Sequence, residues 1–244
     1  MSQNQPITTA MVMAAGHGTR MRPLTDDRSK AMVEVAGRPL IDHMLDRLAD
    51  AGITRAVVNV HAHADHLEAH LRARTTGPEI VISDERDALL ETGGGVVKAL
   101  PLLGEAQILI CNIDAVWSEF APVLPALIDA WDEDEMDDLF LLAPTAECLG
   151  YAGAGDFDMD RMGQLSRRSR ASADWVYAGV QIFTPARALG YAVEPFSRNR
   201  IWDKTLARGR VYGLPIPGYW MHVGDPEAVE AAEAVIATGD DAGA

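Results

Sequence analysis

A glycine-rich loop flanked by cations is the part of the sequence most readily linked to chemistry. Gly16 and Gly18 follow an apolar run at residues 11–15, and the cations Arg20 and Lys30 come after them. Two glycines one residue apart let backbone N–H groups approach a bulky anion without a Cβ in the way, and nearby cations balance its charge. The pattern therefore predicts a cradle for a triphosphate.

Two common phosphate-binding motifs do not describe this loop. The Walker pattern GxxxxGK[ST] is absent, and Met21 stands where the third glycine of a dinucleotide-binding GxGxxG would be. A plain turn between a strand and a helix is the alternative. The additional Thr19, the Pro-Leu-Thr run at 23–25 and Lys30 favour phosphate binding over that turn.

An aspartate at the end of another buried run supplies an anionic group. Residues 108–114 read ILICNID, and the run ends at Asp114. In open parallel sheets, ligands gather beyond the carboxyl ends of the strands, so Asp114 should face the same crevice as the glycine loop. We expect it to be a metal ligand. The alternative is that it caps a following helix.

The surrounding elements must form a sheet that holds these ends together. Apolar runs predict strands, and amphipathic runs between them predict helices, so right-handed crossovers and a mainly parallel sheet with helices on both faces are expected. From Gly150 onward, short runs with polar alternation predict antiparallel strands over the crevice. The expected strands span 11–15, 56–60, 79–83, 108–114, 139–144 and 177–183, and the expected helices span 41–52, about 63–71, a run from 96, 122–131, 199–206 and a terminal run that frays from Thr238.

Size and charge restrict the class of protein. The 244 residues, 48% of them hydrophobic, suit one large α/β domain. A net charge of −15 argues against a general nucleic-acid or anionic-membrane surface. Two cysteines in apolar runs indicate buried thiols, and the chain has no apolar run of membrane-spanning length, so we expect a cytoplasmic protein.

Two further patterns suggest metal sites. His61, His63, Asp65 and His66 form HxHxDH, which is similar to the metal-binding run of metallo-β-lactamase-like zinc hydrolases. Because only two histidines follow, at 70 and 222, we expect instead a helix with His66 and His70 on a solvated face. The acidic run 131–138 lacks the glycine and spacing of a calcium loop, so it is expected to be a solvated turn.

Residues 14–25 read AAGHGTRMRPLT and are followed by Ser29 and Lys30. This stretch resembles the sugar-1-phosphate nucleotidyltransferases, whose pattern is A-A-G-x-G-T-R-M-x-P-L-T followed by Pro-Lys. Ser29 replaces that proline. The run Glu91 to Gly95 reads ETGGG and is similar to the bacterial branch of N-acetylmuramate-1-phosphate uridylyltransferases and mannose-1-phosphate guanylyltransferases.

The resemblance implies a nucleotide-diphospho-sugar transferase fold: a Rossmann-like mixed, mainly parallel sheet with a small antiparallel sugar-side subdomain. It implies one domain over 1–244, with a nucleotide-binding core at 7–145 and a sugar-binding part with the C-terminal helix at 146–237. Arg20 and Lys30 would be catalytic. The implied nucleotide-binding residues are Ala14, Ala15, Gly16, His17, Gly18, Thr19, Arg20, Thr92, Gly93 and Gly94, and the implied sugar-binding residues are Asn112, Asp156 and Gly179.

The resemblance also implies Mg²⁺, held by Asp114 and a second ligand. The family has the pattern W-x-D-x-G-T, in which the aspartate binds metal, whereas this chain has His222 in that place and Asp225 in place of the threonine. Magnesium prefers oxygen ligands. Either His222 acts through a water molecule, or Asp225 takes the role, or the histidine only packs.

The implied reaction is transfer of a nucleotidyl group from a nucleoside triphosphate to a sugar 1-phosphate. We expect UTP and N-acetylmuramate 1-phosphate as substrates and a monomer or small homo-oligomer that binds neither nucleic acid nor membrane. Mannose-1-phosphate guanylyl transfer, a non-catalytic nucleotide-sugar sensor and a zinc hydrolase are the alternatives.

Overall fold

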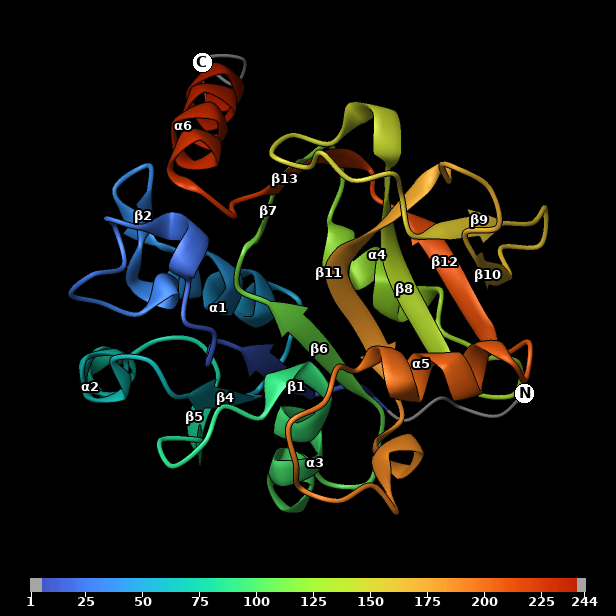
Figure 1. Cartoon of the computed structure of the whole chain (residues 1–244), viewed down its shortest axis with the longest axis horizontal. Coiled ribbons are helices and arrows are strands. Elements are labelled where there is room, and N and C mark those ends of the chain that lie inside the picture. Colours follow the sequence, from blue (N-terminus) through green and yellow to red (C-terminus); the bar gives the residue numbers. More distant parts are fainter. Residues whose placement is uncertain (1–5, 241–244) are drawn as a thin grey trace.

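The computed structural model describes residues 6–240. A nine-stranded mixed sheet runs through the molecule (Figure 1), and its parallel part consists of strands β5, β4, β1 and β6 in that order. Strands β1, β4 and β6 are apolar on both faces, as expected for strands covered on both sides, whereas the edge strand β5 is partly exposed. They span Thr9–Met13 (β1), Arg55–Val60 (β4), Glu79–Asp84 (β5) and Ile108–Asn112 (β6).

The sheet continues beyond β6 in mixed directions. Strand β11 pairs antiparallel with β6 and β8, β12 is parallel to β8, and β9 and β10 form an antiparallel ribbon beside the start of β11. The predicted small antiparallel subdomain is therefore confirmed. These strands span Asp138–Pro144 (β8), Phe157–Met159 (β9), Leu165–Arg167 (β10), Trp175–Phe183 (β11) and Val211–Pro215 (β12).

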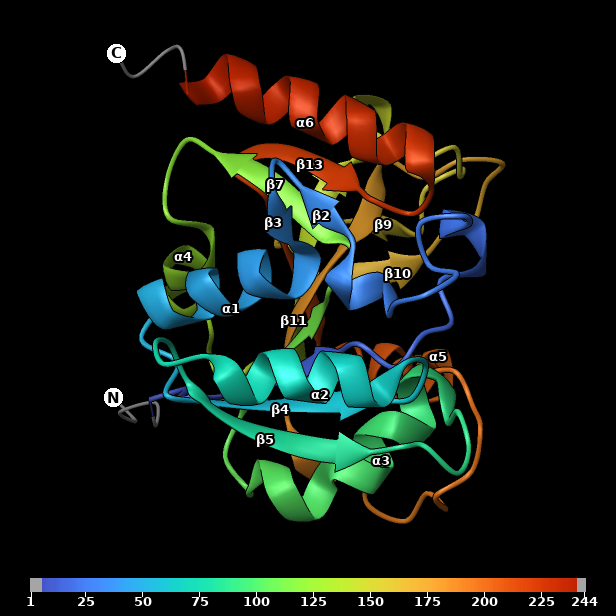
Figure 2. The same ribbon diagram turned by 90° about the vertical axis from the view of Figure 1, so that its left-hand side faces the viewer.

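Helices cover both faces of the sheet, as predicted. Figure 2 shows α1 (Leu40–Asp50) and α2 (Ala64–Ala73) on one side of β4 and β5, with α3 (Glu91–Leu103) on the other. The apolar residues of α1 recur at helical spacing and are buried against the sheet. Two shorter helices complete the layers: α4 (Val123–Asp129) on the side of α1, and α5 (Asn199–Leu206) on the side of α3.

Two small antiparallel pairs lie outside the main sheet. Strands β2 (Glu34–Val35) and β3 (Arg38–Pro39) form one, and β7 (Ala115–Glu119) and β13 (Gly218–His222) form the other. Helix α6 (Pro226–Asp240) follows β13 and packs over β2, β7 and β13 (Figure 2). The pairing of β7 with β13 joins segments about 100 residues apart. No helix in the described part of the chain has the length and apolar character needed to cross a membrane.

The acidic run 131–138 forms a turn in which Asp132, Asp134 and Glu135 are exposed, but the prediction of a solvated turn is wrong for its last two residues. Asp137 and Asp138 are 1% and 0% exposed. Asp137 forms ion pairs with Arg187, Arg208 and Arg210, and Asp138 accepts a hydrogen bond from Gln181 Nε2. The Asp137 charge is buried because basic residues supplied by distant parts of the chain surround it.

The predicted helices 41–52 and 122–131 are shorter, at Leu40–Asp50 and Val123–Asp129, and the boundaries of α3 and α6 differ in a more informative way. The three glycines 93–95 lie inside α3, which begins at Glu91, rather than before the helix. Helix α6 continues through Thr238, whose hydroxyl donates to the Val235 carbonyl, to Asp240. His70 likewise departs from its predicted solvated face, since its Nε2 donates to Asp42 at 3.0 Å.

Candidate active site

The glycine loop leaves the carboxyl end of β1, where its conformation depends on glycine at one position. Gly18 has a φ of +62°, and a Cβ built there would lie 2.9 Å from Lys30 Cβ. The Gly18 carbonyl accepts hydrogen bonds from the Met21 N–H and from the Thr25 hydroxyl. A larger residue would push Lys30 away from the loop, so Gly18 fixes both the turn and the position of the lysine.

A buried polar network supports the loop from behind. The side-chain oxygen Oδ1 of Asn59 accepts from the Ala14 N–H at 2.7 Å, and Nδ2 of the same side chain donates to Glu85 Oε1 at 2.8 Å. Glu85 is fully buried, and its other oxygen accepts from the Leu90 N–H at the start of α3. The network fixes the end of β1 relative to α3, because each buried polar atom in it requires its partner.

Lys30 and Asp114 form the charged centre of the site. Lys30 Nζ donates to Asp114 Oδ2 at 2.8 Å, and the two side chains are 11% and 21% exposed. Burial by itself would raise the pKa of Asp114, but the nearby charges of Lys30 and His222 and the hydrogen bond from Lys30 lower it below its usual value. Asp114 is therefore an ionised carboxylate at neutral pH.

Lys30 keeps its position although Ser29 replaces the proline of the family pattern. Ser29 has a φ of −61°, which lies within the range that a proline ring imposes. Its side chain is buried and accepts a hydrogen bond from the Ala31 N–H. The serine thus reproduces the backbone geometry of proline by capping the short turn that carries Lys30.

His222 reaches the centre through the pairing of β13 with β7. His222 pairs with Ala115, the residue after Asp114, so its ring lies beside that carboxylate, with Nε2 4.0 Å from Asp114 Oδ2. Arg20 Nη2 lies 3.5 Å from the same nitrogen. Burial lowers the pKa of His222, and Lys30 and Arg20 lower it further against the opposing effect of Asp114. The imidazole is neutral at pH 7 and can accept from Arg20.

Asp225 has a structural partner in the described part of the chain. Its Oδ1 accepts from the Ala228 N–H at 2.9 Å, as an N-cap does at the start of α6. This contact leaves the second carboxylate oxygen available, but within residues 6–240 no hydrogen bond or ion pair joins Asp225 to Lys30 or Asp114, whereas His222 Nε2 lies 4.0 Å from Asp114. The geometry therefore favours a capping role for Asp225, while His222 faces the charged centre.

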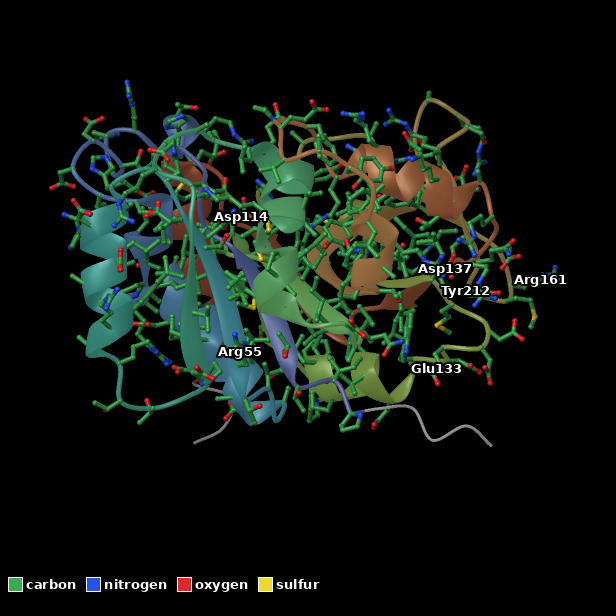
Figure 3. The ribbon with its side chains drawn as sticks, turned by 90° about the horizontal axis from the view of Figure 1, so that it is seen from below. Arg55, Asp114, Glu133, Asp137, Arg161 and Tyr212 are labelled. Atoms are coloured by element: carbon green, nitrogen blue, oxygen red, sulfur yellow. The ribbon has the colours of Figure 1, made fainter. Side chains whose placement is uncertain are left out.

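The glycine loop, Lys30 and Asp114 line a cavity of about 480 Å³ at the carboxyl ends of β1 and β6, whereas His222 and Asp225 do not line it. Figure 3 shows Asp114 at that edge of the sheet and Arg55, the first residue of β4, at the opposite one. Nine residues predicted from the sequence line the cavity: Ala14, Ala15, Gly16, Gly18, Arg20, Lys30, Thr92, Asn112 and Asp114. His17 and Thr19 are exposed on the same loop, and the His17 ring packs edge-on against His61.

The glycines at the start of α3 serve packing. A Cβ at Gly93 would lie 2.3 Å from the Phe196 ring, and one at Gly94 would lie 2.0 Å from the Glu194 carbonyl. The Phe196 carbonyl accepts from the N–H groups of both glycines. These donors are therefore occupied by the protein itself, and it is Thr92, just before them, that lines the cavity.

The three predicted sugar-side residues lie in different surroundings. Asn112 lines the cavity, and its buried Oδ1 meets no hydrogen-bond partner among residues 6–240. Gly179 has a φ of +85° and packs so closely that a Cβ would lie 2.7 Å from Ala115 Cβ. Asp156 accepts from the Tyr177 N–H at 3.0 Å, which ties the β9–β10 ribbon to β11.

Sequence reasoning missed several cavity residues. Glu91 lines the cavity with a φ of +57°, a strained conformation for a residue with a Cβ. Asn59, Ser197 and Gly224 also line it. Asn59 carried a signal, since it is a polar residue inside an apolar strand, whereas Ser197 joins the site only through the folding of the chain before α5.

The HxHxDH run is dispersed by its local structure. His61 Nδ1 contacts the Glu85 carbonyl at 2.7 Å, His63 is the residue before α2, and Asp65 forms an ion pair with Arg86. In the described part of the chain, no three His, Cys, Asp or Glu side chains are grouped so that they could hold a metal ion. A metal ion at Asp114 would therefore need further ligands from water or from the substrate.

Comparison with known proteins identifies the family. The model of the nucleotidyl transferase family matches residues 9–238. This chain belongs to that family. It is 51% identical to the N-acetylmuramate alpha-1-phosphate uridylyltransferase of Caulobacter vibrioides over 97% of this chain and 99% of the relative. It is 31% identical to the enzyme of the same name from Neisseria meningitidis, over 93% and 97%.

Nucleotidyltransferases with other substrates also match. The mannose-1-phosphate guanylyltransferase catalytic subunit beta of Drosophila melanogaster is 26% identical over 90% of this chain and 60% of the relative. A solved UDP-glucose pyrophosphorylase bound to UDP-glucose has the same fold, with a TM-score of 0.79 at 15% identity over 96% of this chain and 99% of that one. The predicted fold and enzyme class, a sugar-1-phosphate nucleotidyltransferase, are confirmed. The sensor and zinc-hydrolase alternatives find no support in these matches.

Proposed function

We propose that this enzyme transfers the uridylyl group of UTP to N-acetylmuramate 1-phosphate, which gives UDP-N-acetylmuramate and pyrophosphate. The observation that carries the proposal is the Lys30–Asp114 pair, 2.8 Å apart, at the edge of a cavity whose other wall is the glycine loop. The 51% identity to the Caulobacter uridylyltransferase supports this choice of substrates.

The residues suit an in-line displacement at phosphorus. A phosphate oxygen of the sugar 1-phosphate forms a bond to the α-phosphorus, the bond from that phosphorus to the bridging oxygen breaks, and the electron pair leaves with pyrophosphate. Both reacting groups are already anionic, so no side chain has to accept a proton. Lys30 and Arg20 would stabilise the phosphate charge, and the loop from Ala14 to Thr19 would hold the triphosphate.

Enzymes of this family generally use a divalent metal ion. The site fits such an ion, because Asp114 is an ionised carboxylate that opens to the cavity, and Mg²⁺ commonly binds through one or two carboxylates together with substrate phosphates. We propose Mg²⁺ at Asp114, with His222 acting through a water molecule and Asp225 left as a helix cap. When bound, the ion would neutralise phosphate charge and orient the triphosphate.

The remaining assignments are parts of the same proposal. Asn112, with an unpartnered buried oxygen at the cavity, would bind the sugar, whereas Gly179 and Asp156 would shape that side through packing. We propose one domain, with its nucleotide-binding core at 7–145 and its sugar-binding part at 146–237. A cytoplasmic location and a monomer or small homo-oligomer complete the proposal.

The test is pyrophosphate release across a matrix of nucleoside triphosphates and sugar 1-phosphates. We expect the highest kcat/KM for UTP with N-acetylmuramate 1-phosphate. Guanylyl transfer to mannose 1-phosphate is the second candidate, because the 26% identical guanylyltransferase covers most of this chain. A higher kcat/KM for GTP with mannose 1-phosphate would replace the proposal with that candidate.

A further inference from the structure

Arg198 is a buried cation next to two residues that line the active-site cavity, although its own side chain does not line it. It follows Ser197, which lines the cavity, and its backbone N–H donates to the hydroxyl of Thr92, another lining residue, at 2.9 Å. The residue is 3% exposed. Its position is thus fixed between the start of α3 and the start of α5.

The guanidinium of Arg198 has few partners. It lies over the rings of Tyr177 and Trp202, 5.5 and 5.0 Å from their centroids, and Nη2 donates to the Tyr177 hydroxyl at 3.2 Å. Within residues 6–240, Nε and Nη1 are buried without a hydrogen-bond partner. An arginine has five N–H donors, and leaving several of them buried and unpaired costs free energy.

No carboxylate of the described chain neutralises this charge by direct contact. Asp138 is the buried acid whose charge acts on the same region, but burial raises its pKa to about 7, so it is a weak counter-ion at neutral pH. A buried charge without a partner is destabilising. An anionic ligand could therefore supply the hydrogen-bond acceptors and the negative charge that the Arg198 guanidinium lacks.

We propose that Arg198 binds a carboxylate carried by the acceptor sugar phosphate and so selects for acidic sugars. The inference rests on the proposed function, because N-acetylmuramate carries a lactyl carboxylate that N-acetylglucosamine lacks. Tyr177 and Trp202 position the guanidinium through their rings. The other anion that could reach Arg198 is the 1-phosphate, and since both sugar phosphates carry it, comparing them separates the two sources.

The experiment measures KM and kcat at saturating UTP with N-acetylmuramate 1-phosphate and with N-acetylglucosamine 1-phosphate. Arg198→Met removes the charge at similar length. We expect its KM for N-acetylmuramate 1-phosphate to rise roughly 10- to 100-fold, the usual effect of losing a charge-assisted hydrogen bond. Its KM for UTP and its kcat/KM for N-acetylglucosamine 1-phosphate should stay within about twofold of wild type. Arg198→Lys should recover part of the loss.

Arg167→Met is the matched control. Arg167 also lies over the Trp202 ring, at 5.7 Å, but its donors are taken by Asp203 and Asn199. It should change the KM of neither sugar phosphate. An equal loss with both sugars in Arg198→Met would assign the arginine to the 1-phosphate and overturn the proposal, as would no loss with either.

A measurement on the wild-type enzyme covers the case in which Arg198→Met does not fold. The methyl ester of the lactyl group removes its charge and adds only one methyl group, so we expect its KM to exceed that of the acid roughly tenfold. Equal KM values would overturn the inference about Arg198. If wild-type enzyme turned over neither the acid nor the ester with UTP, the proposed function itself would be wrong.

Discussion

Asp114 and Asp137 are both acidic residues at strand boundaries with basic partners, yet they lie well apart in the molecule (Figure 3) and at opposite strand ends of one sheet. Asp114 follows the carboxyl end of β6, whereas Asp137 precedes the start of β8. Phe183 of β11 pairs with Ile108, the first residue of β6, and with Asp138. The start of β8 therefore lies level with the start of β6, at the end of the sheet opposite to Asp114.

The two acids differ in how completely the protein satisfies them. Asp137 is 1% exposed and enclosed by three arginines, at 2.5 Å from Arg187, 3.2 Å from Arg208 and 3.0 Å from Arg210. Asp114 has one lysine at 2.8 Å and an open side toward a cavity. We call Asp137 with its three arginines the closed cluster, and Lys30 with Asp114 the open pair. The closed cluster contributes to the stability of the fold, whereas the open pair can exchange its contact for one with a ligand. The predictions below test this contrast.

The largest effect is expected at the open pair. Lys30→Ala should lower kcat by roughly 10²- to 10³-fold, because a preorganised cation next to the reacting phosphate is lost. The thermal midpoint should change little, since Lys30 contacts a carboxylate that water can solvate. Pyrophosphate release and circular dichroism measure the two quantities. Wild-type kcat in this variant would remove Lys30 from the catalytic machinery.

At the closed cluster, Asp137→Asn should act on stability alone. Removing the carboxylate leaves three arginine charges facing one another, and breaking a buried ion cluster costs roughly 3 kcal/mol. Urea unfolding should show this loss, while kcat of the folded enzyme stays near wild type because the cluster lies at the far edge of the sheet. A large fall in kcat with unchanged stability would reverse the roles assigned to the two acids.

Asp138, beside that cluster, should make stability depend on pH. Its pKa is raised by burial from 3.8 in the unfolded chain to about 7 in the folded one. Between these values the folded state holds a proton that the unfolded state has lost, so stability falls by about 1.4 kcal/mol per pH unit as pH rises. Asp138→Asn removes this dependence.

The measurement is urea unfolding of wild type and Asp138→Asn at pH 5 and pH 7. Between pH 5 and pH 7, the wild type should lose roughly 2–3 kcal/mol of unfolding free energy relative to Asp138→Asn. Parallel pH profiles for the two proteins would mean that Asp138 is ionised in the folded state.

A smaller effect is expected where the open site departs from the family pattern. If His222 holds a metal-bound water, His222→Asp should lower the Mg²⁺ concentration for half-maximal turnover several-fold, because a carboxylate is a harder ligand. His222→Ala should raise it. Turnover is measured against Mg²⁺ concentration at pH 8, where the imidazole is neutral. Superimposable curves for all three proteins would show that His222 does not serve the metal.

The smallest effect belongs to Asp225. Because Asp225 is an N-cap, Asp225→Ala should lower the unfolding free energy by about 1 kcal/mol. The dependence of turnover on Mg²⁺ concentration should stay unchanged. A shifted curve at unchanged stability would instead make Asp225 a metal ligand.

The sequence by itself determined the fold class, the location of the glycine loop and the buried strand that precedes Asp114. These features are local: periodic apolar runs specify strands and helices, and Gly18 is required by its own backbone angle. The predicted helix 199–206 matches α5 residue for residue for the same reason.

Other features depend on contacts between segments that are far apart in the chain, and only the tertiary structure decided these. The acidic run 131–138 is locally polar, but arginines from 187 to 210 enclose its last part. The glycines after Thr92 are explained by the packing of Phe196, and His222 reaches Asp114 through the pairing of β7 with β13. Burial and long-range pairing have no local pattern in the chain, because they arise from residues about 50 to 100 positions away.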